Sequence, residues 1–128
     1  MTERIIRHRL ERQAFGWQTK EVHLEITTAL LETKTVVLLD CLSLWVSNML
    51  LAEKSEKTML AELALLLELQ ATREHTLIIV SNEVGSGLVP EYALGRTYRD
   101  WLGRANQMVA ATSSHAYLLV AGLPLKLK

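Results

Sequence analysis

The sequence is poor in cysteine, the residue whose disulfides stabilise small extracellular domains, and it also has little proline and phenylalanine. Its 128 residues contain one cysteine, Cys41, two prolines and one phenylalanine. A single cysteine excludes an intramolecular disulfide and is typical of a reducing compartment. The 14 basic and 14 acidic side chains cancel to a formal net charge of zero. Because no overall field then favours nucleic acid or an anionic membrane, we expect a local site to carry the function.

Long hydrophobic runs and several familiar motifs are also absent. No apolar stretch approaches the roughly 20 residues of a membrane span, and no charged leader with an apolar core precedes residue 36. The chain has no zinc-spaced Cys/His cluster, no G-x-S-x-G, no dinucleotide fingerprint and no G-x-x-x-x-G-K-[ST] phosphate loop. We therefore expect one cytoplasmic domain over residues 1–128, with neither nucleic-acid nor membrane partners.

Three apolar runs predict the strands of an α/β fold, at residues 36–40, 77–81 and 116–121. Helical patterns at 42–52 and 58–74 separate the first two runs, and such a crossover makes the flanking strands parallel. The second run does not alternate apolar with polar residues, which predicts a strand buried on both faces. We expect a three-layer domain with a mainly parallel sheet in which all three strands are neighbours.

The remaining patterns predict helices and an edge. Residues 2–13, 22–31 and 90–112 have the spacing of helices. Residues 123–128 alternate apolar with basic side chains and contain a proline, which confines them to an edge strand or a tail.

Polar residues follow two of the apolar runs. Asp40 ends the first, and Asn82 and Glu83 follow the second, ahead of a Gly85-Ser86-Gly87 loop. Ligands of open α/β sheets bind beyond the carboxyl ends of the strands, and a carboxylate there is typical of the residue that helps hold Mg²⁺ in phosphate-transfer proteins. The alternative is a strand followed by an ordinary polar turn.

The helix predicted at residues 2–13 is rich in arginine. Arg4, His8 and Arg12 follow one another at four-residue spacing and share one face. Because nearby cations disfavour a protonated imidazole, we expect a neutral His8, which is the form that acts as a nucleophile or ligand. The same cations would attract a phosphate chain. The alternative is a solvated charged helix on which His8 has no role.

Two further features leave alternatives open. Glu21 precedes the helix predicted at 22–31, where a carboxylate either supplies an N-terminal charge or faces a ligand. In the helix predicted at 90–112, Gly95 and Gly103 each cost about 1 kcal/mol relative to alanine, so we expect close approach of another helix or a ligand at both.

Five segments together resemble the bifunctional adenosylcobinamide kinase/adenosylcobinamide-phosphate guanylyltransferase family of cobalamin biosynthesis, and the resemblance covers essentially the whole chain. They are R-I-x-x-H-R-x-x-R (4–12), DCLSLWVSNML (40–50), SNEVGSGLVPE (81–91), R-x-x-R-D-x-x-G-R-x-N-Q (96–107) and the ending AGLPLKLK. The resemblance implies a P-loop-NTPase-like domain and a homo-oligomer, a trimer.

The resemblance also implies a reaction and its residues. His8 matches the residue that forms a covalent guanylyl-histidine intermediate, from which GMP passes to adenosylcobinamide phosphate. Mg²⁺ is implied near Asp40, with GTP and ATP as substrates and adenosylcobinamide and its phosphate as partners. A loop and helix near the substrate or a subunit contact contain Asn82, Glu83, Arg96 and Arg99. The positions that match GTP contacts are Arg9, Leu10, Glu11, Arg12, Glu21 and Asp40.

One departure from the family pattern is large. The family begins with a strand, a glycine-rich phosphate loop and a helix, and this βαβ unit of some thirty residues is missing here. The kinase reaction depends on that loop, so we do not expect this polypeptide to phosphorylate adenosylcobinamide. The alternative to an enzyme is a non-catalytic remnant that binds nucleotide weakly or serves as an assembly subunit.

Overall fold

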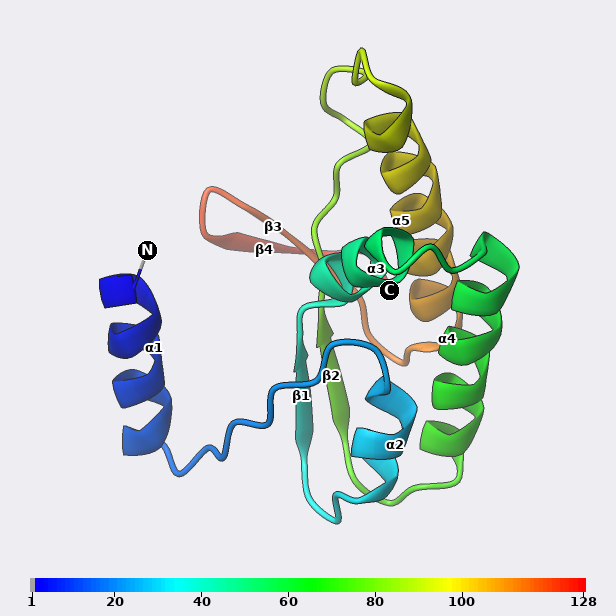
Figure 1. The fold of residues 1–128 in the computed structure, drawn as a ribbon. Coiled ribbons are helices and arrows are strands. Elements are labelled where there is room, and N and C mark those ends of the chain that lie inside the picture. Colours follow the sequence, from blue (N-terminus) through cyan, green and yellow to red (C-terminus); the bar gives the residue numbers. More distant parts are fainter. Residues whose placement is uncertain (1) are drawn as a thin grey trace.

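The structure, a computed structural model, describes residues 2–128, with the side chains of residues 6, 7 and 9–128. It is a mixed α/β fold (Figure 1). The elements are, in chain order, α1 (Thr2–Ala14), α2 (Ile26–Leu31), β1 (Val37–Asp40), α3 (Leu42–Leu51), α4 (Glu56–Ala71), β2 (Leu77–Val80), α5 (Ala93–Thr112), β3 (Tyr117–Val120) and β4 (Leu123–Lys126). No helix within residues 2–128 is both long and apolar enough to cross a membrane.

The predicted parallel pair of strands is confirmed. β1 and β2 run parallel, in a register that pairs Val37 with Leu77 and Asp40 with Val80. The helices α3 and α4 lie between them in sequence and form the crossover that parallel strands require. Both strands therefore end at the same edge of the sheet, which places Asp40 beside the start of the segment after β2.

One face of this small sheet is covered. Alternate strand residues, Val37 and Leu39 in β1 and Leu77 and Ile79 in β2, are half-buried against the core. Figure 1 shows α2, α4 and α5 on one side of the two strands, with α1 standing off on the other. The helices supply the largest fully buried side chains, which are Leu42, Val46, Met59, Leu63, Leu66 and Leu102.

The other face of the sheet is bare, so the prediction of two buried faces is wrong. The side chains of Ile78 and Val80 are 45% and 43% exposed, and Leu38 beside them is exposed as well. An uninterrupted apolar run indicates that both faces of a strand can be buried. It does not show that other elements pack on both faces, and in the described chain the core packs against one face only.

The third predicted strand does not join the parallel sheet. β3 instead pairs antiparallel with β4, with Val120 opposite Leu123. Ala121 and Gly122 form the two-residue turn between them, with φ of 51° and 79°. Two successive positive φ values are the geometry of the tight hairpin turns that match strand twist. The local turn thus outcompetes the predicted long-range pairing, and the prediction that 123–128 forms an edge or tail holds for β4.

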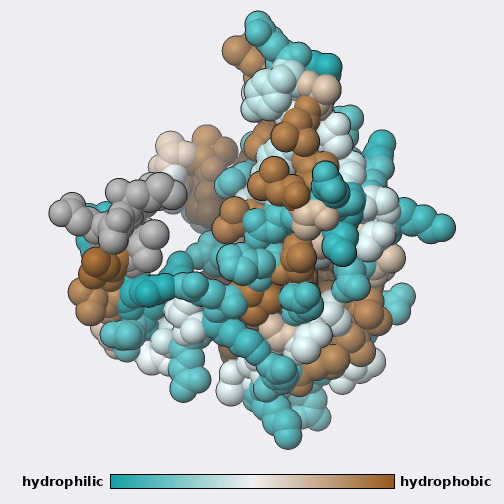
Figure 2. All heavy atoms as spheres, viewed as in Figure 1, coloured by the Kyte–Doolittle hydropathy of each residue, from teal (hydrophilic) through white to brown (hydrophobic). Residues whose placement is uncertain are grey.

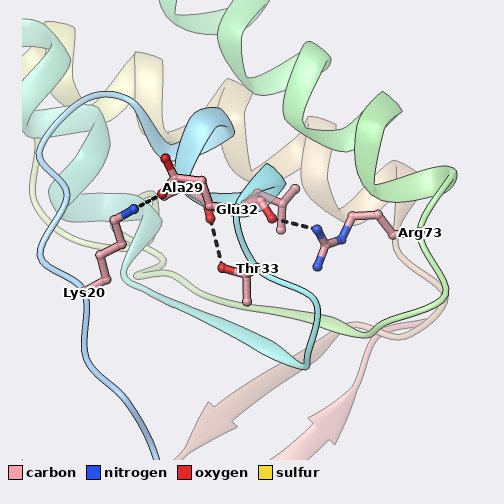
Figure 3. A network of polar contacts seen from close by, with 6 residues as sticks. Lys20, Ala29, Glu32, Thr33 and Arg73 are labelled. Atoms are coloured by element: carbon pink, nitrogen blue, oxygen red, sulfur yellow. Dashed lines mark hydrogen bonds and ion pairs between the residues drawn. The ribbon is translucent and has the colours of Figure 1, made fainter.

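The start of α4 follows a local capping signal. Ser55 ends the charged link before α4, and its Oγ accepts a hydrogen bond from the backbone N–H of Thr58 at 3.1 Å. The short helix α2 is fixed by side chains from elsewhere (Figure 3). Lys20 forms an ion pair with Glu32 just after α2, and Arg73 donates to the carbonyl oxygen of Leu30 at 2.6 Å.

Candidate functional site

Among the described side chains, two ion pairs connect α1 to the rest of the chain. Arg12 Nη2 lies 2.5 Å from Asp40 Oδ2 at the carboxyl end of β1. Arg9, three residues earlier on the same side of the helix, pairs with Glu21 in the segment that follows α1. Two of the predicted arginines and two of the predicted carboxylates, Glu21 and Asp40, therefore meet in the folded chain, although they are distant in sequence.

Two adjoining hollows surround these ion pairs. The first, of about 120 Å³, is lined by Arg12, Asp40 and Leu38 of the bare sheet face. The second, of about 500 Å³, is lined by Arg9, Gln13 and Glu21, and falls within the range of about 300–1,000 Å³ that small-molecule sites occupy. Three residues line both hollows and join them: Trp17, Gln18 and Thr19.

The electrostatics of the hollows suit a displaceable anion. The side chains of Arg12 and Asp40 are each 40% exposed, and those of Arg9 and Glu21 more so. Exposed ion pairs of this kind contribute about 0–1 kcal/mol to stability. A phosphate group accepts bidentate hydrogen bonds from guanidinium groups, so it can take over both arginines at small cost to the fold.

Asp40 is the one predicted metal ligand, and its surroundings fit Mg²⁺ in a particular way. Among residues 6, 7 and 9–128, no group of three or more His, Cys, Asp or Glu side chains could hold a metal ion. Mg²⁺ keeps several waters and commonly takes one or two carboxylates together with substrate phosphates. A single half-exposed carboxylate at a strand end, paired with Arg12, meets that requirement when a phosphate chain is bound.

Other predicted residues of α1 have different surroundings. Leu10 is exposed. Glu11 Oε1 lies 3.8 Å from Arg7 Nε, in an i, i+4 ion pair within α1. The backbone of position 8 lies in α1, one turn before Arg12, but the side chain of His8 is outside the described residues. Glu21 does not charge the N-terminus of α2, because that helix begins only at Ile26 and Glu21 pairs with Arg9.

Asn82, Glu83, Arg96 and Arg99 lie outside both hollows, in the segment after β2 and in α5. Asn82 and Glu83 begin the loop after β2, which spans residues 81–91 (the β2–α5 loop). Both are exposed, and they follow Val80, the residue paired with Asp40. The two arginines lie on α5 and contact the backbone of this loop rather than either hollow.

Sequence reasoning missed Trp17, which lines both hollows. Its side chain is 39% exposed, whereas the chain's other two tryptophans, Trp45 and Trp101, are 3% and 9% exposed. Gly16, with φ of 77°, turns the chain just before it. The available signal was a large aromatic residue in a polar segment after a glycine, a place where a core residue is not expected.

A buried cluster lies just behind the strand end. Tyr98 of α5 donates its phenolic O–H to the carbonyl oxygen of Ser43 at 3.2 Å, and Ser43 Oγ lies 3.0 Å from Cys41 Sγ. Burial, and to a smaller extent the charge of Cys41, raises the pKa of Tyr98 above its ordinary value. The neutral phenol is therefore the form that suits the folded chain.

The two glycines of α5 differ. At Gly95 a Cβ atom would lie 2.8 Å from the Pro90 side chain and 2.7 Å from the Tyr92 ring, so a close approach is present there, but it comes from the residues just before α5 rather than from another helix. At Gly103 a Cβ would meet nothing within 4 Å among the described residues, so no other helix of the described chain approaches that position.

Comparison with known proteins gives consistent matches. A family model described as cobinamide kinase / cobinamide phosphate guanyltransferase matches residues 1–127. The bifunctional adenosylcobalamin biosynthesis protein CobP of Pseudomonas aeruginosa is 37% identical over 131 residues, which cover 100% of this chain and 75% of that protein. The bifunctional adenosylcobalamin biosynthesis proteins CobU of Salmonella typhimurium and Escherichia coli are each 34% identical over 143 residues, covering 100% of this chain and 78% of theirs.

Proposed function

The chain belongs to the cobinamide kinase / cobinamide phosphate guanyltransferase family of cobalamin biosynthesis, and we propose that it transfers a guanylyl group from GTP to adenosylcobinamide phosphate. Guanylyl transfer is the family reaction that the candidate site supports, because Arg9 and Arg12 lie on the helix that contains position 8 and meet carboxylates around the two hollows.

The proposed reaction has two displacements. A nitrogen of His8 attacks the α-phosphorus of GTP, so that a P–N bond forms while the P–O bond to pyrophosphate breaks and pyrophosphate leaves. A phosphate oxygen of adenosylcobinamide phosphate then attacks the same phosphorus. A new P–O bond forms, the P–N bond breaks and His8 is restored. Splitting a difficult transfer into two easier steps is ordinary covalent catalysis.

The remaining residues would bind and orient the nucleotide. Arg9 and Arg12 donate to phosphate oxygens and stabilise the charge that develops on the departing pyrophosphate. Mg²⁺, when bound, neutralises part of the phosphate charge, and Asp40 is the carboxylate that would hold it. The faces of Trp17 offer an apolar surface on which a purine ring can stack.

One observation carries the proposal. Arg9 and Arg12, each drawn from the helix that contains position 8, meet Glu21 and Asp40 around two joined hollows. Position 8 lies one helical turn from Arg12. A nucleotide whose phosphates replaced the carboxylates at these arginines would therefore bring its α-phosphorus to the same helix.

The experiment is incubation with GTP labelled at the α-phosphate in the presence of Mg²⁺. We expect label that is stable in alkali and labile in acid, as a phosphoramidate is, and that disappears in His8→Ala. His75→Ala is the matched control, because it removes a histidine just before β2, outside either hollow, and should keep the label. Absence of label from the unsubstituted chain would support the non-catalytic remnant instead. The homo-oligomer stays a prediction, which light scattering would test.

A further inference from the structure

The β2–α5 loop is held to α5 by side chains of that helix. At the start of the loop, Ser81 Oγ donates to Asn106 Oδ1 at 2.6 Å. The amide nitrogen of the same Asn106 donates to the carbonyl oxygen of Asn82 at 3.0 Å. One side chain therefore fixes two consecutive loop residues, directly after the strand position that pairs with Asp40.

Two arginines hold the rest of the loop. Arg99 donates to the carbonyl oxygen of Gly85 in the middle of the loop. Arg96 donates to the carbonyl oxygen of Pro90, at 3.0 Å, and to that of Glu91. The contacts run in antiparallel order, because the loop rises along the helix in Figure 1 while α5 descends beside it. We call Asn106, Arg99 and Arg96 the α5 clamp.

The clamp residues share one side of a well-anchored helix. Positions 96, 99 and 106 are three and seven residues apart, which places them along one side of α5. Beside them, Trp101, Leu102 and Ala105 are buried in the core. The clamp therefore grips the loop from a rigid element, and the glycine at position 95 lets Pro90 and Tyr92 pack directly on the helix.

Holding the loop by its carbonyl groups has a geometric consequence. In a trans peptide the C=O of one residue and the N–H of the next point in opposite directions. Capture of the carbonyls of Asn82 and Gly85 thus turns the N–H groups of Glu83 and Ser86 away from α5. Neither N–H group has an acceptor among the described residues. The side chains of Asn82 and Glu83 are exposed, and the Glu83 carboxylate accepts a hydrogen bond from the N–H of Gly85 within the loop.

We propose that Asn106, Arg99 and Arg96 are positioning residues, which preset the β2–α5 loop so that Asn82 and Glu83 stand at the strand end beside Asp40 before the substrate arrives. The identity of the ligand as GTP rests on the proposed function. The clamp residues line neither hollow, and Asn82 and Glu83 adjoin the site only through the strand end, where Val80 pairs with Asp40. The clamp acts through the loop, since a loop that is already ordered binds without an ordering cost.

The first test is amide hydrogen exchange in the chain without nucleotide. Asn106→Ala and Arg99→Gln should speed exchange within residues 81–92 about tenfold or more, because each removes a hydrogen bond that holds the loop. Asn106→Asp guards against a defect of packing, because it keeps the size of the side chain and the oxygen that accepts from Ser81, while it replaces the donor to Asn82 by a charged acceptor. Arg104→Gln is the matched control, because Arg104 lies on the same helix but pairs with Glu56.

The second test is nucleotide affinity. Because Trp17 is the exposed one of three tryptophans, quenching of tryptophan fluorescence by Mg²⁺-GTP reports on the hollows. The clamp variants should weaken binding about tenfold, with the melting temperature as in Arg104→Gln, and Arg99→Lys should recover part of the loss. A purely structural contact would change the melting temperature and leave affinity unchanged.

The outcomes separate the two proposals. If amide hydrogen exchange in the loop of the clamp variants were as slow as in Arg104→Gln, the proposal that these side chains hold the loop would be wrong. Faster exchange with unchanged GTP affinity would overturn the positioning role of the clamp. If the unsubstituted chain gave neither quenching nor label with GTP, the proposed function would fail, and the exchange rates alone would still decide whether the three side chains hold the loop.

Discussion

The two faces of the β1–β2 sheet have nearly the same composition and opposite surroundings. Val37, Leu39, Leu77 and Ile79 pack against the helices, whereas Leu38, Ile78 and Val80 are half-exposed on the other side. The bare face also adjoins the candidate site, because Leu38 lines the hollow that holds Arg12 and Asp40. In Figure 2 apolar side chains are visible between polar ones on the surface of the molecule.

The difference assigns separate tasks to the two faces. The covered face carries the buried contacts that stabilise the fold, and each large aliphatic side chain buried there contributes about 1.5–3 kcal/mol. The bare face contributes less to stability and leaves room for the site. Substitutions on the two faces should therefore have separable effects, and three experiments follow from this.

The largest effect on stability is expected from a large-to-small substitution in the core behind the covered face. Leu63 in α4 is fully buried, so Leu63→Ala should lower the free energy of unfolding by about 2–5 kcal/mol through lost burial and a cavity. Leu65→Ala, two residues along, is the matched control because Leu65 is 45% exposed. Urea denaturation measures both. Equal losses at the two positions would contradict the assignment of the core to this side.

An intermediate effect is expected on the bare face. Its apolar side chains should bind the dye 8-anilinonaphthalene-1-sulfonate, which fluoresces on exposed hydrophobic surface. Replacing Ile78 and Val80 together by threonine should reduce that fluorescence severalfold while keeping strand propensity. The control is Leu94→Gln, which removes an exposed leucine from α5. If Leu94→Gln reduced the signal as strongly as the strand substitutions, the dye would not be reporting on the sheet.

The smallest effect concerns pH and the helices behind the covered face. Burial raises the pKa of Tyr98, so the folded chain favours the neutral phenol. The resulting stability is complete below the unfolded value of about 10 and is lost as pH rises through the higher folded pKa. Thermal unfolding between pH 9 and 11 should show a fall that is smaller in Tyr98→Phe. Tyr117→Phe, in the exposed hairpin, should behave like the unsubstituted chain.

Much of the fold could be predicted from the sequence because its signals are local. The apolar runs and helical patterns placed β1, β2 and every long helix to within a few residues, and the intervening helices gave the parallel pairing. The prediction that β3 pairs with the parallel sheet was wrong, because the local pattern of a strand does not say which other strand it will pair with. In the structure β3 pairs with β4. The turn at Ala121 and Gly122 decided that pairing, and two residues of ordinary type carry little warning of it.

The site could be predicted only in part. Asp40, Glu21 and the arginines were identified from their residue types, from the strand end and from family resemblance, and the structure brings four of them together. Their pairing as Arg9 with Glu21 and Arg12 with Asp40 depends on the path of residues 15–25. This segment has no helical pattern before residue 22, and the helix predicted from residue 22 begins only at Ile26. Trp17 and the clamp residue Asn106 were missed as site residues for the same reason, because each acts through a contact distant in sequence.

The two-stranded sheet has a practical consequence that concerns its rims rather than its faces. In residues 2–128 β1 and β2 pair only with each other, so each strand has one row of backbone groups open to strands from neighbouring molecules. Neither strand contains the proline or lysine that commonly discourages such stacking. Protein concentration should therefore be controlled in every assay, because high concentration favours pairing of β1 or β2 with strands of neighbouring molecules.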